Sequence, residues 1–248
     1  MTRVFLLSGP ACVGKGPLVK EIKRRFGMKL IEVPVIKSFE SREGILRPTD
    51  VPAHFFPAAT IMSWQGDPRY LVGDCRGYPQ AIDIKMVRDA AQNTDDKTIL
   101  IEAYHTIGRQ LQESLSYVIP NLTALSVFLS PLSQQEINDL RATGVDFPQY
   151  LETLMLHKQL VRARSFGRFS GGIAQRDFLP RAKGAYDELC SAWKFYGVLV
   201  SYDAEGRPNW EDPIQGDASR LVRSFGSLLQ GKDAVDLEHW EPGLLAKA

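Results

Sequence analysis

Short apolar runs alternate with amphipathic stretches along most of the chain. The apolar runs are rich in β-branched and aromatic residues, which is typical of buried strands. The predicted strands are Arg3–Ser8, Leu30–Ile36, Thr98–Ile101, Leu122–Leu129 and Gly197–Ser201. Apolar positions at helical spacing predict helices between them. The predicted helices are Leu18–Phe26, Ala81–Gln92, Phe147–Arg164, Arg181–Phe195 and Asp217–Leu229. Strands alternating with helices indicate an α/β fold with a central parallel sheet.

Two local signals refine this pattern. Ser133-Gln-Gln-Glu136 has the spacing of a capping box and predicts a further helix that ends near Gly144. Gly27 is expected to stop the first helix, so that the first 27 residues form a strand, a glycine-rich turn and a helix.

The length and composition fit one domain. The chain has 248 residues, of which 44% are hydrophobic, enough to bury a sizeable core. We expect a single domain over residues 1–230 and a peripheral charged tail over 231–248. The segment 37–80 loses clean periodicity and is rich in Pro, Gly, Arg and Phe, so we interpret it as an insertion on the substrate side.

Charge and cysteine content exclude several classes of partner. With 30 basic and 29 acidic residues the net charge is +1, so no long-range field favours nucleic acid or an anionic membrane. The three cysteines lack metal-binding spacing, which favours a cytoplasmic protein with reduced thiols. The N-terminal apolar run is short, and no stretch of about 20 apolar residues occurs, so we expect a soluble protein. His54, His105 and His157 also lack ligand spacing. Trp64, Trp193 and Trp210 are predicted to serve packing rather than base stacking.

The segment Gly9-Pro-Ala-Cys-Val-Gly14-Lys15 carries the chemistry, because it matches G-x-x-x-x-G-K between a predicted strand and a predicted helix. Backbone amides of such a loop point at phosphate oxygens, the helix start adds partial positive charge, and the lysine neutralises the β- and γ-phosphates. We therefore predict a nucleoside triphosphate site. Its expected residues are Gly9, Ala11, Cys12, Val13, Gly14, Lys15 and Gly16. The alternative is a glycine turn with a solvated lysine.

One departure concerns metal placement. Gly16 and Pro17 follow the lysine, where a hydroxyl that helps to place Mg²⁺ is usual. Pro17 is compatible with the first helical turn, because its missing amide hydrogen has no partner there in any case. The loop is therefore expected to bind phosphate even though metal placement is altered.

The stretch GPACVGKGPLVKEI resembles the phosphate loop of guanylate kinases. Ile99–Glu102, Leu129–Gly144 and Tyr196–Tyr202 are similar to further segments of that family, so the resemblance covers most of residues 3–203. It implies a P-loop NTPase-type three-layer fold with a central parallel sheet, an inserted substrate subdomain at 37–80 and a lid at 141–181. It also implies ATP and Mg²⁺ as cofactors and transfer of the γ-phosphoryl group to a nucleoside monophosphate or a related small phosphorylated acceptor.

The resemblance assigns acceptor residues within and beyond the insertion. The nearest matches to the family's monophosphate site are Arg42, Arg47, Asp50 and Tyr78, with Ser38 in the same set. Paired arginines make bidentate contacts to phosphate, although a solvated arginine pair is the alternative. Tyr104 and Gln80 stand where the family reads guanine, and a phenol cannot replace a carboxylate that accepts from two guanine donors. GMP is therefore expected to be a poor acceptor.

The remaining assignments concern catalysis. Glu102 is interpreted as a carboxylate that orders Mg²⁺ through water, or else as a strand-end charge. The family's lid arginines fall at Thr143 and Leu154 by strict count. Their nearest cationic neighbours are Arg141 and Lys158, and Arg162 and Arg164 are alternatives. We expect Lys15, Glu102, Arg141 and Arg162 to act in catalysis.

Two rival functions stay open. One is a catalytically silent guanylate-kinase-like module that binds a partner protein, and the other is a P-loop kinase of a non-nucleotide metabolite. A homodimer is also left open.

Overall fold

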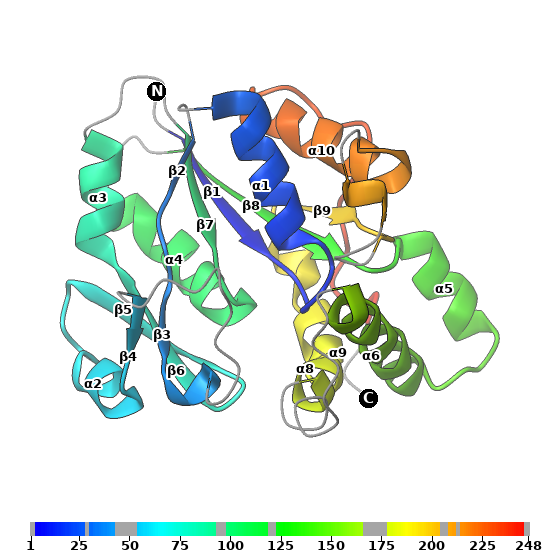
Figure 1. The fold of residues 1–248 in the computed structure, drawn as a ribbon, viewed down its shortest axis with the longest axis horizontal. Coiled ribbons are helices and arrows are strands. Elements are labelled where there is room, and N and C mark those ends of the chain that lie inside the picture. The colour runs from blue at the N-terminus through cyan, green and yellow to red at the C-terminus, as the bar shows by residue number, and fades with distance from the viewer. Residues whose placement is uncertain are drawn as a thin grey trace. The chain divides into compact units, whose positions relative to one another are not determined.

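A computed structural model describes residues 3–27, 30–42, 54–92, 98–118, 123–165, 178–203, 208–211 and 214–245 (Figure 1). The chain divides into two compact units. The first unit contains Met1–Ser8 and Met28–Ser126, and the second contains Gly9–Gly27 and Val127–Ala248. The boundary falls just before the loop at Gly9 and again inside one strand of the main sheet.

The main sheet has the strand order β10-β9-β8-β1-β7-β2. In the first unit, β1 (Arg3–Ser8) and β2 (Leu30–Glu32) both pair in parallel with β7 (Thr98–Glu102). The register places Leu7 opposite Glu102, so the carboxyl ends of β1 and β7 lie together. The predicted α/β fold with a mostly parallel central sheet is confirmed, and so are the predicted strands at Arg3–Ser8 and Thr98–Ile101.

Two helices enclose the core of the first unit. They are α3 (Ile84–Gln92) and α4 (His105–Val118). Val4, Leu6 and Ile99 of the strands share one fully buried cluster with Val87 of α3 and Leu111 of α4. Burial of such aliphatic side chains is worth about 1.5–3 kcal/mol each, which fixes the strand ends from which the loops depart.

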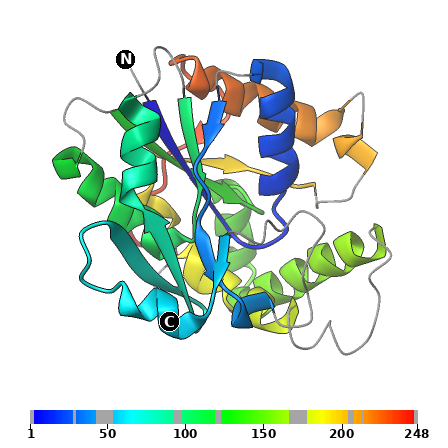
Figure 2. The same cartoon turned by 60° about the vertical axis from the view of Figure 1, so that its left-hand side comes forward.

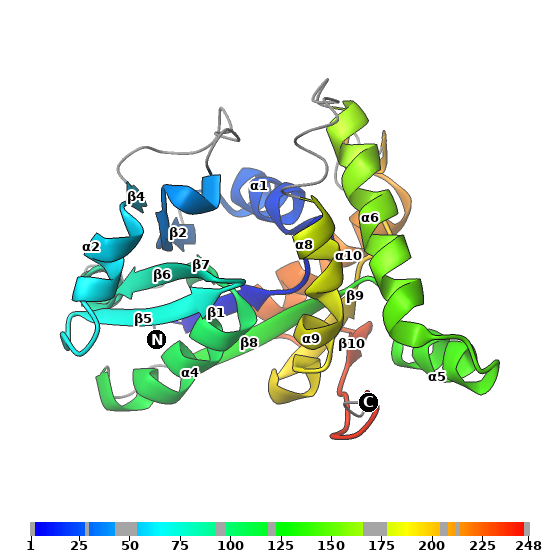
Figure 3. The same cartoon turned by 90° about the horizontal axis from the view of Figure 1, so that it is seen from below.

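A second, four-stranded sheet in the order β4-β3-β6-β5 also belongs to the first unit. Its strands are β3 (Ile36–Ser38), β4 (Phe55–Phe56), β5 (Tyr70–Cys75) and β6 (Tyr78–Asp83). The short 3₁₀ helix η2 (Glu40–Arg42) follows β3, and α2 (Ala58–Ser63) precedes β5. Ile61 of α2 packs on Ile36 and Ala81 of this sheet, while α4 lies along β5 (Figure 3).

Two predicted elements are corrected here. Leu30–Ile36 forms not one strand but two, β2 and β3, in different sheets. Pro34 lies between them and has no amide hydrogen for a strand ladder. The predicted helix Ala81–Gln92 begins only at Ile84, because Asp83 Oδ1 accepts the amide hydrogens of Lys85 and Met86 and so caps the helix.

The second unit carries the remaining strands and helices. Its strands are β8 (Thr123–Ser130, from Val127 onward), β9 (Gly197–Val200) and β10 (Leu237–Glu238). Its helices include α1 (Lys15–Phe26), α5 (Gln134–Ala142), α6 (Phe147–Ser165) and α10 (Gly216–Leu229). β8 and β9 pair in parallel, and α1 packs beside α10 (Figure 2). The capping box of Ser133 and Glu136 at the start of α5 is confirmed.

The predicted helix Arg181–Phe195 is wrong as a single element. It consists of α8 (Leu179–Lys183), α9 (Ala185–Leu189) and the 3₁₀ helix η5 (Ala192–Lys194). Gly184, a weak helix former, separates the first two. The Ser191 hydroxyl donates to Glu188 O at 2.7 Å. A serine side chain that bonds a nearby carbonyl in this way competes with the backbone hydrogen bonds of a helix.

The tail after Gly231 takes part in the fold of the second unit. β10 pairs antiparallel with β9, and Trp240 is buried. Glu238 Oε2 accepts hydrogen bonds from the Gln134 amide at 3.0 Å and from Trp240 Nε1 at 2.7 Å. The expectation of a peripheral tail is therefore wrong for this segment.

Across the parts of the chain given above, no helix combines the length and apolar character needed to cross a bilayer. Cys12, Cys75 and Cys190 form no disulfide bond with any described residue.

The charge on α1 makes one pH effect testable. Glu21 is 8% exposed and accepts hydrogen bonds from Arg24 and Arg25 at 2.7–2.8 Å. Chiefly the hydrogen bonds from Arg24 lower the Glu21 pKa from 4.5 to about 2, while burial opposes them. Because the folded-state pKa lies below the unfolded one, the carboxylate stabilises the fold above pH 4.5, and this contribution is lost as the pH falls toward 2.

We expect Glu21→Gln to lower the free energy of unfolding at pH 7 by about 1–2 kcal/mol, a value discounted because both arginines are partly exposed. Urea unfolding from pH 7 to pH 2 measures this. The variant should lose less stability than the wild type between pH 4.5 and 2. Glu113→Gln, in an exposed pair with Arg109, is the control and should change stability by less than about 0.5 kcal/mol. Equal acid sensitivity of wild type and Glu21→Gln would contradict the assignment.

Candidate functional site

The loop between β1 and α1 has backbone angles that favour glycine. Gly9 has φ 138° and Gly14 has φ 87°, and Cys12 also lies in the left-handed region at φ 67°. Gly14 occupies the cap position of α1, where no side chain caps the helix. The first turn of α1 contains no acidic residue. The start of α1 thus presents backbone amides and the positive end of the helix dipole, which is the arrangement that binds anions.

Neighbouring atoms leave no room for side chains at the two glycines. A Cβ on Gly9 would lie 2.4 Å from Leu129 O at the end of β8. A Cβ on Gly14 would lie 2.9 Å from Cζ2 of Trp210, in the 3₁₀ helix η6 (Pro208–Trp210). The loop is therefore fixed by close packing as well as by backbone angles.

Lys15 spans the loop. Its Nζ donates to Gly9 O at 2.6 Å and to Pro10 O at 2.8 Å. Val13 is fully buried, whereas Gly16 is exposed, and Pro17 lies in the first turn of α1 as predicted. The ammonium group is thus held by two backbone carbonyls of the loop in which the sequence predicts a triphosphate site.

Helix α6 brings two cations to this part of the second unit. Arg162 Nη1 lies 3.6 Å from Cys12 Sγ of the loop. Lys158, one turn earlier, is 4% exposed, and its Nζ donates to Ser201 O at 3.3 Å and to Tyr202 O at 2.5 Å. Residues four apart share one helix face. The structure therefore places Arg162, one of the predicted catalytic residues, against the phosphate loop.

Arg141 is engaged elsewhere. Its Nη1 donates to Leu244 O of the C-terminal segment, so the structure gives no support to its predicted catalytic role. Thr143 donates its hydroxyl to Leu140 O at 2.6 Å within α5. Arg164, the other alternative, is exposed near the end of α6.

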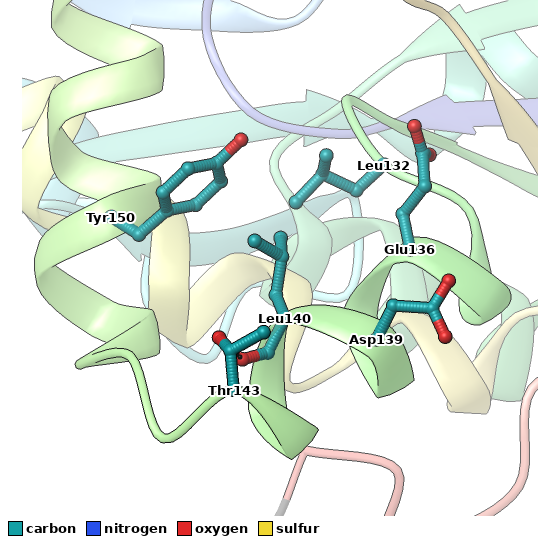
Figure 4. A pocket seen from close by; sticks show the side chains of 6 residues that line it. All are labelled: Leu132, Glu136, Asp139, Leu140, Thr143 and Tyr150. Atoms are coloured by element: carbon teal, nitrogen blue, oxygen red, sulfur yellow. Dashed lines mark hydrogen bonds between the residues drawn. The ribbon is translucent and has the colours of Figure 1, made fainter.

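A hollow of about 260 Å³ lies between α5 and α6 (Figure 4). Its lining residues are Leu132, Glu136, Asp139, Leu140, Thr143 and Tyr150. Glu136 is part of the capping box, and Asp139 accepts from Gln135. Its two carboxylates, Glu136 and Asp139, make this hollow unsuitable for phosphate.

The predicted acceptor residues belong to the first unit. Glu102 is exposed at the end of β7, directly before Tyr104 and α4. Tyr78 is 42% exposed and Gln80 is half-buried; both lie on one side of β6. That side of the sheet faces α4. Gly73 of β5 is paired with Gln80, so both residues point to the same side, and a Cβ on Gly73 would lie 3.3 Å from Cβ of Ile107 in α4.

The structure adds Arg76, which the sequence reasoning missed. Its guanidinium carbon lies 4.9 Å from the centre of the Tyr104 ring. The His105 ring packs edge-on against the same Tyr104 ring, with the two ring centres 4.4 Å apart. Arg76 and Gly77 both have positive φ, 56° and 84°, in the turn between β5 and β6. The Arg-Gly pair before Tyr78 is a hairpin-turn signal that could have indicated this position.

The structure says less about the other residues predicted to bind the acceptor. The Ser38 hydroxyl is buried and accepts the amide hydrogen of Ser41 at 3.3 Å, so it holds the turn into η2. Arg42 ends η2. Arg47 and Asp50 lie outside the described residues. Within the described ranges, no three His, Cys, Asp or Glu side chains form a group that could hold a metal ion.

Comparison with known proteins identifies the fold but no family by sequence. Neither a protein-family model nor a curated protein matches the chain. Among solved structures, the chain is similar to the crystal structure of guanylate kinase from Anaplasma phagocytophilum, with a TM-score of 0.52 and 12% sequence identity over 93% of this chain and 85% of that chain. The chain therefore has a guanylate-kinase-like, P-loop NTPase-type fold, as the resemblance implied.

The packing at Gly9 yields a prediction. We expect Gly9→Ala to destabilise the protein by about 3 kcal/mol or more, because the new Cβ meets a backbone oxygen at 2.4 Å in addition to the strain at positive φ. Gly66→Ala is the matched control, since Gly66 has φ 90° but open space around it. It should cost only about 1–2 kcal/mol. Equal effects in thermal or urea unfolding would show that the contact with Leu129 is unimportant.

Proposed function

We propose that the chain is an ATP-dependent phosphotransferase of the guanylate kinase type. The observation that carries the proposal is the loop at Gly9–Gly16, in which Lys15 bridges two loop carbonyls beside the uncapped start of α1. A triphosphate fits this arrangement because each of its groups would meet amides, a helix dipole or an ammonium group.

The proposed reaction breaks the bond between the γ-phosphorus and the β,γ-bridging oxygen of ATP and forms a bond to a phosphate oxygen of the acceptor, with ADP as the leaving group. Such transfers depend on positioning and charge neutralisation rather than on a covalent nucleophile. Lys15 and the loop amides would hold the β- and γ-phosphates. Arg162 would stabilise charge on the transferred group from α6.

Magnesium enters this proposal as the ATP complex, where it supplies further neutralisation of phosphate charge. The loop itself offers no hydroxyl ligand, since Gly16 and Pro17 follow Lys15. Glu102 is exposed at a strand end, and a carboxylate there suits contact through metal-bound water. The donor set fits a metal held mainly by the nucleotide.

The acceptor is proposed to be a small phosphorylated molecule other than GMP. Arg42, Arg47, Asp50 and Tyr78 stay as candidates for its phosphate. Arg76 covers one face of the Tyr104 ring with a cation, which changes the chemistry of the position that reads guanine in the family. Tyr104, Gln80 and Arg76 would instead suit a different base, a modified base or an anionic group without a base.

Two observations favour the silent protein-binding module as a second candidate. Pro17 replaces a loop hydroxyl, and Arg141 is used by the C-terminal segment. A kinase of a non-nucleotide metabolite differs from the main proposal only in the acceptor.

The loop assignment is tested by calorimetry with ATP and Mg²⁺. We expect the wild type to bind and Lys15→Ala to bind at least tenfold more weakly, with a loss of about 2–4 kcal/mol in transition-state stabilisation where turnover is measurable. Lys20→Ala, an exposed position on the same helix, is the control and should bind normally. Equal binding by wild type and Lys15→Ala, or binding by neither, would show that the loop does not hold a triphosphate.

The acceptor is tested by an ADP-release screen of GMP, dGMP, AMP, CMP, UMP, dTMP and small sugar phosphates at equal concentration. We expect GMP to be a poor phosphoryl acceptor, because Tyr104 stands where the family has a guanine-reading carboxylate. A carboxylate at that position can favour guanine over other bases by about 10⁴-fold, and this preference is lost without it. Turnover of GMP at a kcat/KM near 10⁴–10⁸ M⁻¹s⁻¹ would contradict this expectation. ATP binding without turnover of any acceptor would favour the silent module.

A further inference from the structure

The contacts that α6 makes change character along the helix. Its large buried apolar side chains all lie in the first half: Phe147, Leu151 and Met155. In the second half, which carries Arg162, the buried residues are Lys158, Gln159 and Ala163. An alanine methyl group buries little apolar surface, so this half of the helix is held chiefly by the hydrogen bonds of Lys158 and Gln159.

Lys158 ties α6 to the end of β9. It is 4% exposed, and its Nζ donates to Ser201 O at 3.3 Å and to Tyr202 O at 2.5 Å. Removing an ammonium group from water is costly even when the group meets acceptors. An apolar side chain of similar length would fill the same space without that cost. The lysine is therefore explained by what its hydrogen bonds position rather than by its burial.

The end of β9 and the phosphate loop belong to one framework within the second unit. The Ser201 amide donates to Ser130 O at 2.8 Å, at the end of the neighbouring strand β8. Leu129, one residue earlier in β8, packs so closely on the loop that a Cβ on Gly9 would lie 2.4 Å from Leu129 O. A side chain of α6 that binds the carbonyl of Ser201 is thereby positioned relative to the loop.

The neighbouring residue Gln159 makes a different connection. It is 2% exposed, and its Nε2 donates at 3.0 Å to the carbonyl of Phe178, directly before α8. This bond joins α6 to another helix and not to the sheet. Gln159 is therefore a matched comparison for Lys158, because both are buried side chains of α6 that donate to a backbone carbonyl.

We propose that Lys158 is a positioning residue, which binds the end of β9 and so holds α6 where Arg162 meets the phosphate loop. Arg162 follows Lys158 by four positions on the same helix face, and its Nη1 lies 3.6 Å from Cys12 Sγ of the loop. Lys158 acts through Arg162 and touches no ligand itself. This inference rests on the proposed function of the loop, in which Arg162 stabilises charge on the phosphates.

The experiment is a double-mutant cycle, with the affinity for ATP and Mg²⁺ measured by calorimetry. Its members are the wild type, Lys158→Met, Arg162→Met and the double variant. Lys158→Met removes the ammonium group and keeps an unbranched stem. We expect each single variant to bind ATP about fivefold more weakly or worse, as for the loss of a hydrogen bond that involves a charged group. The double variant should bind within about twofold of Arg162→Met, because Lys158 acts only through Arg162.

Two further variants separate positioning from general loosening of the helix. Gln159→Met removes the neighbouring buried hydrogen bond and should bind ATP within about twofold of the wild type. Lys158→Arg keeps a cation that can donate to the same carbonyls and should restore binding to within about threefold. Circular dichroism and thermal unfolding establish that each variant is folded. If Lys158→Met does not fold, Lys158→Gln, which is uncharged and shorter, takes its place in the cycle.

Several results would overturn the inference. If the losses of the two single variants multiply in the double variant, or if either single variant binds ATP like the wild type, Lys158 does not act through Arg162. If Gln159→Met weakens binding as much as Lys158→Met, or if Lys158→Arg restores nothing, the lysine serves only the packing of α6. If the wild type itself does not bind ATP, the proposed function of the loop fails as well, which distinguishes that failure from the others.

Discussion

The phosphate loop depends on the absence of side chains at residues 9 and 14. Gly9 lies directly against the carbonyl group of Leu129, and Gly14 lies against Trp210 while it starts α1 in a left-handed conformation. Any other residue at either place would push the loop off the strand end or off the helix start. The orientation of the loop amides, the reach of Lys15 and the contact of Arg162 with Cys12 all follow from that close packing.

Local arrangement, not net charge, supplies the cationic groups of the proposed triphosphate site in this nearly neutral chain. The net charge is +1, yet the second unit brings together the start of α1, Lys15 and two α6 cations, Lys158 and Arg162. A buried lysine is costly to hold, and Lys158 is kept by carbonyl oxygens at the end of β9. Two carboxylates of the second unit have other roles: Glu136 caps α5, and the buried Glu21 pairs with Arg24 and Arg25 of α1.

The sequence predicts well those parts that depend on short-range pattern. The strand–loop–helix unit at 3–27 and the capping box at Ser133 follow from residue types at fixed spacing, and both are confirmed. Contacts between distant segments leave no such signal. Arg162 against Cys12, Arg141 against Leu244 and Glu238 against Gln134 join residues 103–150 positions apart, so their partners emerge only in the fold. Two element boundaries differ from the hydrophobic pattern, because Pro34 lacks an amide hydrogen for a strand and the Asp83 side chain caps α3.

Strain in the loop argues for ligand binding rather than a purely structural role. Cys12 holds a left-handed backbone conformation that costs a non-glycine residue about 1–2 kcal/mol, and the Ser201 and Trp210 donors beside Gly14 add unpaired buried groups. A module that used this fold only to present a protein-binding surface would gain from relaxing each of these features. A phosphate chain at the loop, as proposed above, would offset part of this cost, because the loop amides would then gain charged acceptors. The strained loop therefore agrees better with the proposed phosphotransferase than with the proposed silent module.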